Sequence, residues 1–97
     1  MLIVAGTFEV DPADRDAFLA SRSDSIRSTR TESGCLEYAL SADSVDDTRV
    51  LLFERWADQE SFDAHVAGLQ TAPRPDGPAP KSMSVKIYDI SGERPFG

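Results

Sequence analysis

The chain has 97 residues and a mass of 10.6 kDa, with 40% hydrophobic and 28% charged residues. We expect one small domain, residues 1–97, because chains this short rarely build two separate cores. Seventeen acidic against ten basic residues give a net charge of −7, which repels nucleic-acid phosphates and anionic membrane surfaces. The single cysteine, Cys35, can form no internal disulfide, and no run reaches the roughly 20 apolar residues of a membrane helix. These features predict a cytoplasmic protein that binds neither nucleic acid nor membranes.

A strand followed by a long helix is predicted for the first third of the chain. Residues 2–10 are apolar and β-branched, which is typical of a strand. Asp11 and Pro12 then form a helix-start signal, and no further Gly or Pro occurs until Gly34 provides a stop signal. We therefore expect one continuous helix over residues 12–32.

A β-hairpin and a second helix are predicted for the middle of the chain. Residues 35–40 and 49–56 are strand candidates, and the polar, acid-rich segment 41–48 joins them. Asp58 can cap a short helix that ends near Gly68.

The last third of the chain begins with a proline-rich segment. Residues 70–80 hold four of the six prolines, so that neither a helix nor a central strand can pass through them. Residues 82–90 alternate with period two and predict a last strand, followed by a tail at residues 91–97. The resulting order βαββαβ predicts an α+β, ferredoxin-like fold, with an antiparallel sheet and both helices on one face.

Both faces of the predicted sheet carry large apolar side chains. In the strand at residues 49–56, alternation places Leu52 and Trp56 on one face and Leu51 and Phe53 on the other. The two helices can cover only one face, and the other needs a cover such as the same face of a second copy. We expect a homodimer through this open face. The alternative is a monomer with scattered exposed apolar residues.

Three segments of the chain resemble, in combination, a known protein family. They are Gly34-Cys35-Leu36-Glu37-Tyr38, Phe53-Glu54-Arg55-Trp56 and Ser61-Phe62-Asp63-Ala64-His65. Together they resemble the antibiotic biosynthesis monooxygenases, a family of dimeric α+β barrels, over about residues 2–69 and the last strand. The resemblance implies the ferredoxin-like fold and the homodimer. Family members include oxygenases that oxidise phenols or quinols without metal or flavin, dimers that degrade haem, and proteins with no established activity.

The resemblance also implies a pocket between the sheet and the helices. Trp56 would line this pocket, and Leu52 and Glu54 would share its wall because they lie on the same strand face. The chain departs from the phenol-oxidising branch in having Leu52 where that branch has an asparagine, and Phe62 where it has a tyrosine. No histidine stands where the haem-degrading branch places its axial ligand. We therefore expect no haem, and no other cofactor or metal.

His65, the only histidine, is the candidate catalytic base. A cofactor-free oxygenase must deprotonate a phenol or quinol so that the anion can pass an electron to oxygen. A neutral imidazole suits this task near neutral pH. The alternative is a packing or capping histidine at the rim of the second helix, at the edge of its apolar stripe.

Glu54 and Arg22 are the candidate charged groups of the site. A carboxylate beside aromatic bulk either pairs with a cation or has its pKa raised by desolvation. Arg22 falls inside the apolar stripe of the first helix, where it could pair with Glu54, bind a carboxylate or enolate of the ligand, or extend its stem to solvent. The small, polar Ser25 on the same stripe leaves room for a pocket.

Aromatic side chains complete the predicted site. Trp56 and Phe62 would shape the pocket for an aromatic ligand, although Trp56 could equally be plain core. Tyr38 and Tyr88 could bond to a ligand, but a position at the dimer interface is favoured. The sequence thus predicts a cofactor-independent monooxygenase acting on a phenol or quinol. The alternative is a non-catalytic small-molecule-binding or stress-response dimer, which a pocket filled by side chains would favour.

Overall fold

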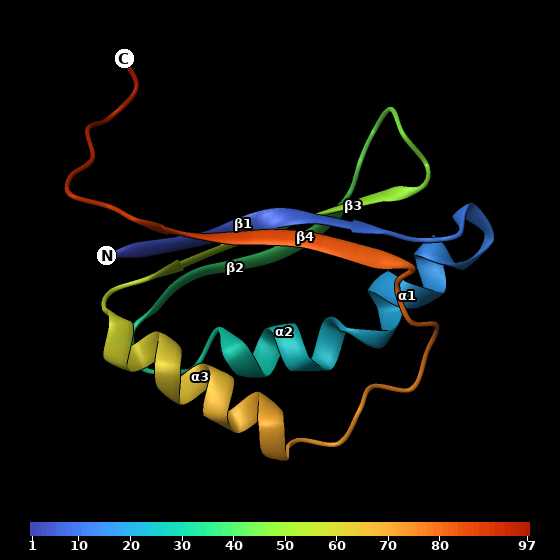
Figure 1. Cartoon of the computed structure of the whole chain (residues 1–97), viewed down its shortest axis with the longest axis horizontal. Helices are drawn as coiled ribbons and strands as arrows, with labels where there is room; N and C mark the ends of the chain where they lie inside the picture. Colours follow the sequence, from blue (N-terminus) through green and yellow to red (C-terminus); the bar gives the residue numbers. More distant parts are fainter.

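The computed structural model describes residues 1–97 and contains a four-stranded sheet with all helices on one face (Figure 1). The elements in chain order are β1 (Leu2–Glu9), the 3-10 turn η1 (Pro12–Asp14), α1 (Arg15–Ser21), α2 (Ser23–Thr29), β2 (Cys35–Ala42), β3 (Arg49–Trp56), α3 (Gln59–Thr71) and β4 (Ser82–Asp89). The strands are ordered β2-β3-β1-β4, and every neighbouring pair is antiparallel. This arrangement confirms the predicted ferredoxin-like fold.

The two faces of the sheet follow the predicted alternation. On β3, Glu54 and Trp56 are buried on the side that faces the helices. Leu51 and Phe53, on the same strand, point to the opposite side and are each 37% exposed. The second apolar face is therefore present, and no helix of the chain covers it (Figure 1).

Six of the seven buried apolar side chains form two separate clusters near opposite ends of β1 and β3. One cluster consists of Leu2, Val4 and Trp56, and the other of Val10, Phe18 and Val50. Phe18 comes from α1, which therefore closes the second cluster. The first cluster is bordered by Phe62 of α3. Each end of the helical layer thus depends on its own apolar contacts with the sheet.

The prediction of one continuous helix over residues 12–32 is wrong. The segment is divided into η1, α1 and α2, and the break between the last two lies at Arg22. The Ser21 hydroxyl donates a hydrogen bond to the Phe18 carbonyl at 2.7 Å, and the Ser25 hydroxyl donates to the Arg22 carbonyl at 3.1 Å. Such bonds compete with the hydrogen bonds of the helix backbone and bend helices. The serine-rich sequence therefore accounts for the break.

The second of the two predicted helices corresponds to α3. It begins as predicted but continues beyond its predicted end. The Asp58 carboxylate accepts a hydrogen bond from the Ser61 amide at 2.8 Å, which caps α3. The helix passes through Gly68 and ends at Thr71, two residues before Pro73. Pro73 disfavours a helical conformation in the residue before it, and so stops the helix where Gly68 does not.

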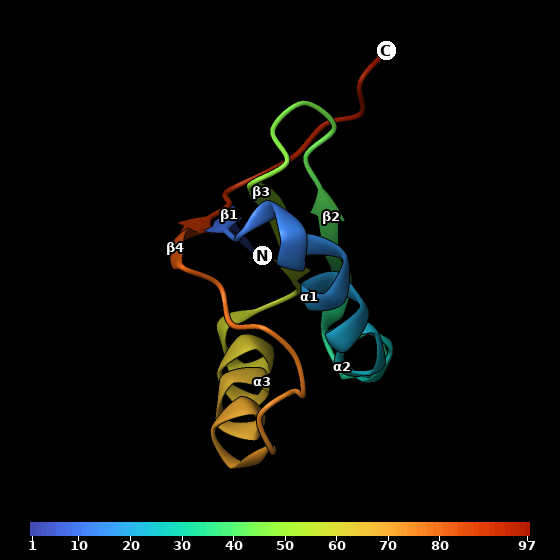
Figure 2. The ribbon, with the colours of Figure 1, turned by 90° about the vertical axis from the view of Figure 1, so that its right-hand side faces the viewer.

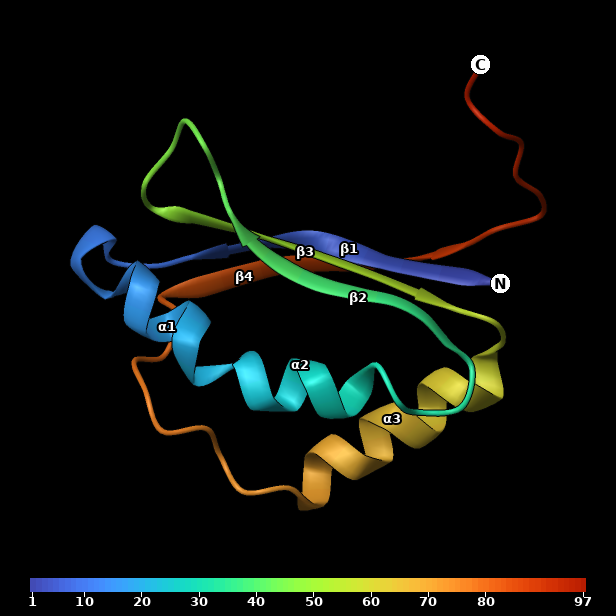
Figure 3. The ribbon, with the colours of Figure 1, turned by 180° about the vertical axis from the view of Figure 1, so that it is seen from behind.

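The helices form two groups beneath the sheet. Seen from the side and from behind, α1 and α2 lie beneath β2, and α3 lies toward the β4 side (Figures 2 and 3). The predicted proline-rich loop is confirmed from residue 72 onward and returns the chain from α3 to β4. At Gly77 it packs so closely on α1 that an added Cβ would lie 2.6 Å from Cβ of Ser21. None of the helices has the length and apolar character needed to cross a membrane.

Candidate functional site

His65 is the one buried residue of α3 and is only 4% exposed. Its ring centroid lies 4.8 Å from that of Trp56, with an angle of 33° between the planes. Tyr38 approaches it edge-on at 5.7 Å, and Phe62 lies 6.5 Å away. The structure therefore places His65 in contact with an aromatic cluster, Tyr38, Trp56 and Phe62, rather than at the rim of the helix.

Glu32 contacts the imidazole of His65 at Nδ1. Nδ1 of His65 lies 2.7 Å from Oε2 of Glu32, whose side chain is 39% exposed. Glu32 comes from the turn between α2 and β2, 33 positions away in sequence. Sequence reasoning missed this residue, because a glutamate at a helix end is ordinarily solvated. The one available signal was Gly34, which marks a turn that could bring its neighbours against another element.

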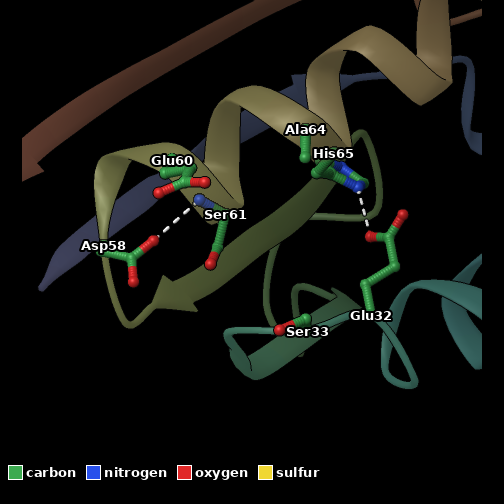
Figure 4. Close-up of a pocket in the computed structure, with 7 residues that line it drawn as sticks. All are labelled: Glu32, Ser33, Asp58, Glu60, Ser61, Ala64 and His65. Carbon is green, nitrogen blue, oxygen red and sulfur yellow. Dashed lines mark hydrogen bonds and ion pairs between the residues drawn. The ribbon is translucent and has the colours of Figure 1, made fainter.

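A groove of about 460 Å³ opens beside the His65–Glu32 pair (Figure 4). Its lining consists of Glu32, Ser33, Asp58, Glu60, Ser61, Ala64 and His65. Ala64 is the one hydrophobic residue among them, and three carboxylates give the groove an acidic character. No three His, Cys, Asp or Glu side chains of the chain are grouped so as to hold a metal ion. The groove connects the buried imidazole with solvent.

Glu54 is buried on the same face of β3 as Trp56. The indole Nε1 of Trp56 donates a hydrogen bond to its Oε1 at 3.0 Å. Burial raises the pKa of Glu54 above its ordinary value, although the indole hydrogen bond and the nearby His65 act in the opposite direction. The expected pairing with Arg22 is therefore wrong, because the indole is the partner of this carboxyl.

Arg22 lies at the break between the first two helices and does not line the groove. Its guanidinium carbon lies 4.8 Å from the ring centroid of Phe18, and its Nε is buried without a hydrogen-bond partner. Burial and the nearby Glu54 raise the pKa of Tyr38 to about 12, against the opposing charge of Arg22. Arg22 thus lies near the aromatic cluster, but the structure does not bring it together with His65 in one cavity.

Tyr38 occupies the helix-facing side of β2, opposite Glu54 in the strand register. The favoured position for Tyr38 at a sheet-to-sheet dimer interface is therefore wrong. Tyr88 is paired with Ile3 and lies on the open face, where it is exposed. Of the two tyrosines, only Tyr88 therefore lies on the open face of the sheet.

The other predicted ligand-binding residues lie apart from the groove. Leu52 is buried on the helix-facing side of β3, and Phe62 packs on Trp56 with ring centroids 6.1 Å apart. Ser25 is exposed and donates its hydroxyl to the backbone of α2. None of the three lines the groove beside His65.

The helix-facing side of β4 carries apolar surface that the chain leaves uncovered. Ile87 lies opposite the buried Val4 in the register, yet it is 53% exposed. Met83 is also exposed, and Val85 between them is half-buried. We call Met83, Val85 and Ile87 the β4 strip. Because Val85 packs against the cluster that contains Trp56, the strip is continuous with the candidate site.

Replacing Glu54 with glutamine should remove a contribution to stability that falls as pH rises. The pKa of Glu54 is raised in the folded state, so its carboxyl stabilises the fold below the ordinary value of 4.5 and loses that contribution as pH rises through the raised pKa. The free energy of unfolding of the native chain, minus that of Glu54→Gln, should therefore fall over this range. Urea unfolding at fixed protein concentration, followed by the fluorescence of Trp56, measures it. A constant difference would contradict the burial effect.

Comparison with known proteins identifies relatives of this chain. Residues 1–70 match the sequence model of the family described as antibiotic biosynthesis monooxygenase. The uncharacterized protein sll1783 of Synechocystis is 33% identical over 97 residues, which cover 93% of this chain and 63% of that protein. The chain therefore spans less than two thirds of the length of this curated relative.

Solved structures share the fold over nearly the whole chain. A proposed antibiotic biosynthesis monooxygenase from Deinococcus radiodurans superposes with a TM-score of 0.78 at 18% identity, covering 100% of this chain and 99% of its own. Rv0793 from Mycobacterium tuberculosis gives 0.70 at 26% identity, covering 95% and 96%. The heme-degrader MhuD from the same organism gives 0.73 at 13% identity, covering 98% and 100%. A common fold thus extends to proteins of quite different sequence.

Proposed function

Because the chain belongs to the antibiotic biosynthesis monooxygenase family, we propose that it is a cofactor-independent monooxygenase acting on an aromatic phenol or quinol. The observation that carries this proposal is the buried His65, held through Nδ1 by Glu32 and reached from solvent by the groove. An imidazole that donates from Nδ1 keeps the lone pair of Nε2 for a proton. His65 would therefore act as the general base for the substrate hydroxyl.

The proposed reaction takes all its electrons from the substrate. Nε2 of His65 accepts the hydroxyl proton, and the phenolate passes one electron to molecular oxygen, giving an aryloxyl radical and superoxide. These two combine at a ring carbon that bears hydrogen, and the imidazolium returns a proton to form a hydroperoxide. Loss of the ring hydrogen as a proton breaks the O–O bond and releases water. One phenol and one oxygen molecule thus give one quinone and one water.

Apolar and charged groups near His65 support the binding of an aromatic ligand. The half-buried Phe62 offers a ring beside Trp56, and the β4 strip offers exposed apolar surface next to the same cluster. Glu54, whose pKa is raised by burial, would exchange protons within this site. Arg22, whose Nε lacks a partner, would bind an anionic oxygen of the ligand.

We further propose that the chain forms a homodimer through the open face of its sheet, as in a dimeric α+β barrel. Leu51, Phe53 and Tyr88 are exposed on this face, and the helices all lie on the other (Figure 1). Burying such a face against its own copy gives a symmetric interface. Each subunit would keep its own ligand site, because His65 lies between α3 and the sheet, on the side away from the open face. A cytoplasmic location stays a prediction.

A second candidate function is that of a non-catalytic small-molecule-binding or stress-response dimer. The direct packing of His65 on Trp56 favours it, because side chains occupy the position next to the indole ring. Arg22 also lies outside the groove, so that the charged groups expected of the enzyme do not meet in one cavity.

Oxygen uptake distinguishes the two candidates. The protein is mixed in metal-free buffer with a panel of phenols and hydroquinones, and oxygen consumption and quinone formation are recorded together. The enzyme should consume one oxygen molecule per quinone and place one labelled atom from ¹⁸O₂ in the product. Saturable quenching of Trp56 fluorescence without oxygen uptake by any compound would favour the binding protein instead.

A further inference from the structure

We propose that Glu32 is the positioning residue of His65, fixing the imidazole proton on Nδ1 and leaving Nε2 as the acceptor. The catalytic consequence rests on the proposed function, whereas the interaction itself is a property of the free protein. Oε2 of Glu32 lies 2.7 Å from Nδ1, well within hydrogen-bonding distance (Figure 4). The hydrogen bond made by one ring nitrogen of a histidine determines which nitrogen carries the proton. A carboxylate can only accept here, so it selects the Nδ1–H form.

The backbone around Glu32 is tied to the elements on both sides of the site. The Glu32 amide donates to the Thr29 carbonyl at 3.0 Å, and its own carbonyl accepts from the Cys35 amide at 3.2 Å. Gly34 adopts a positive φ of 81°. Its carbonyl accepts from the Ala57 amide at 2.8 Å, just before α3 begins. The turn is therefore held against the segment that leads into α3, which carries His65. The backbone of Glu32 is thus fixed in position, and its side chain reaches the imidazole from there.

Close packing between the turn and α3 reinforces this placement. A Cβ on Gly34 would lie 2.1 Å from Oγ of Ser61 in the first turn of α3. Only a glycine allows this approach together with the positive φ. Ser61 precedes His65 by four residues, so that both lie on one face of α3. The turn that carries Glu32 is thus docked on the helix face that carries the imidazole.

Two other carboxyls near His65 have different partners. Asp58 caps α3, and Glu54 accepts the indole hydrogen bond from Trp56. Glu32 is therefore the carboxylate that contacts the ring of His65. Its negative charge also stabilises the imidazolium that forms when Nε2 takes a proton, which lowers the barrier to proton transfer.

The tautomer of His65 tests this role without any substrate. The chain contains one histidine, so long-range ¹H–¹⁵N correlation spectra of the full chain report on that ring alone. The neutral ring should show a protonated Nδ1 and an unprotonated Nε2. Glu32→Gln keeps an acceptor oxygen and should retain this form, whereas Glu32→Ala should shift the proton toward Nε2. Asp63→Asn, which removes an exposed carboxylate bonded to Gln59, serves as the matched control and should change nothing.

Kinetics test the catalytic consequence. With a phenol or hydroquinone that the protein oxidises, Glu32→Ala should lower kcat about 10- to 100-fold, the range for losing a hydrogen bond to a charged group. KM should change little, and Glu32→Gln should lie between the alanine variant and the native chain. Near-UV circular dichroism of Trp56 confirms that each variant is folded.

The possible outcomes separate this inference from the proposed function. A native ring protonated on Nε2, or a tautomer that Glu32→Ala leaves unchanged, would overturn the positioning role. An unchanged kcat in folded Glu32→Ala would overturn it as well. If no compound is oxidised, the proposed function fails, and the spectra of the native chain and the alanine variant still decide the role of Glu32.

Discussion

Replacing His65 with asparagine should lower kcat for phenol or quinol oxidation about 10²- to 10⁴-fold, the usual contribution of a general base. The asparagine amide can still donate to Glu32 in place of Nδ1, but nothing replaces Nε2. The variant therefore removes the proton acceptor while keeping the contact that orients it. Oxygen uptake at saturating substrate gives kcat, and near-UV circular dichroism of Trp56, the only tryptophan, reports on the fold around the site.

The control for this experiment is Asp63→Asn, which introduces the same side chain on the exposed side of α3. It should retain native turnover, because Asp63 touches neither the groove nor the aromatic cluster. Undiminished turnover in a folded His65→Asn protein would mean that another group takes the proton. Glu54 would then be the next residue to replace.

Replacing Phe53 with glutamate should convert the proposed dimer into a monomer. The substitution places a carboxylate in the middle of the open face. A symmetric interface contains this carboxylate twice, once from each subunit. Burying an unpaired charge costs several kcal/mol, so the dissociation constant should rise by about 10³-fold or more. Light scattering at micromolar concentration should give about 21 kDa for the native chain, twice its 10.6 kDa, and 10.6 kDa for the variant.

Leu69→Glu is the matched control for the dimer experiment. Leu69 is 54% exposed on α3, which lies on the helix side of the sheet and away from the open face (Figure 1). The same charge at this position should leave the dimer intact. A native chain that remains monomeric at these concentrations would contradict the proposed interface, whatever the variants do.

The strands and their faces could be predicted from local sequence, because alternation is a property of each strand alone. The apolar and β-branched residues of β1 and β3 fixed both the strand positions and the two apolar faces. The face of Tyr38 could not be predicted in this way. The β2–β3 register shifts between Cys35 and Glu37, and a shift of one residue exchanges the two faces of a strand.

The helices and the site depended on contacts that local patterns do not contain. The break at Arg22 results from serine hydroxyls that bond back to the helix carbonyls, whereas the pattern of apolar residues favoured one helix. His65 and Trp56 were identified by their residue types and by the resemblance to the family. Glu32 was not, because its role comes from a turn that meets α3 only in the folded chain.

The break between α1 and α2 also bears on how this protein can vary in evolution. Each piece has seven residues, too few for a helix that is stable by itself, and each is therefore held by its own contacts. The cluster around Phe18 secures α1 at one end of the sheet, while Glu32 and His65 lie at the other. Substitutions in α2 can therefore shift the turn that carries Glu32 while α1 keeps its anchor on the sheet. The groove beside His65 can thus change its shape at little cost to the fold.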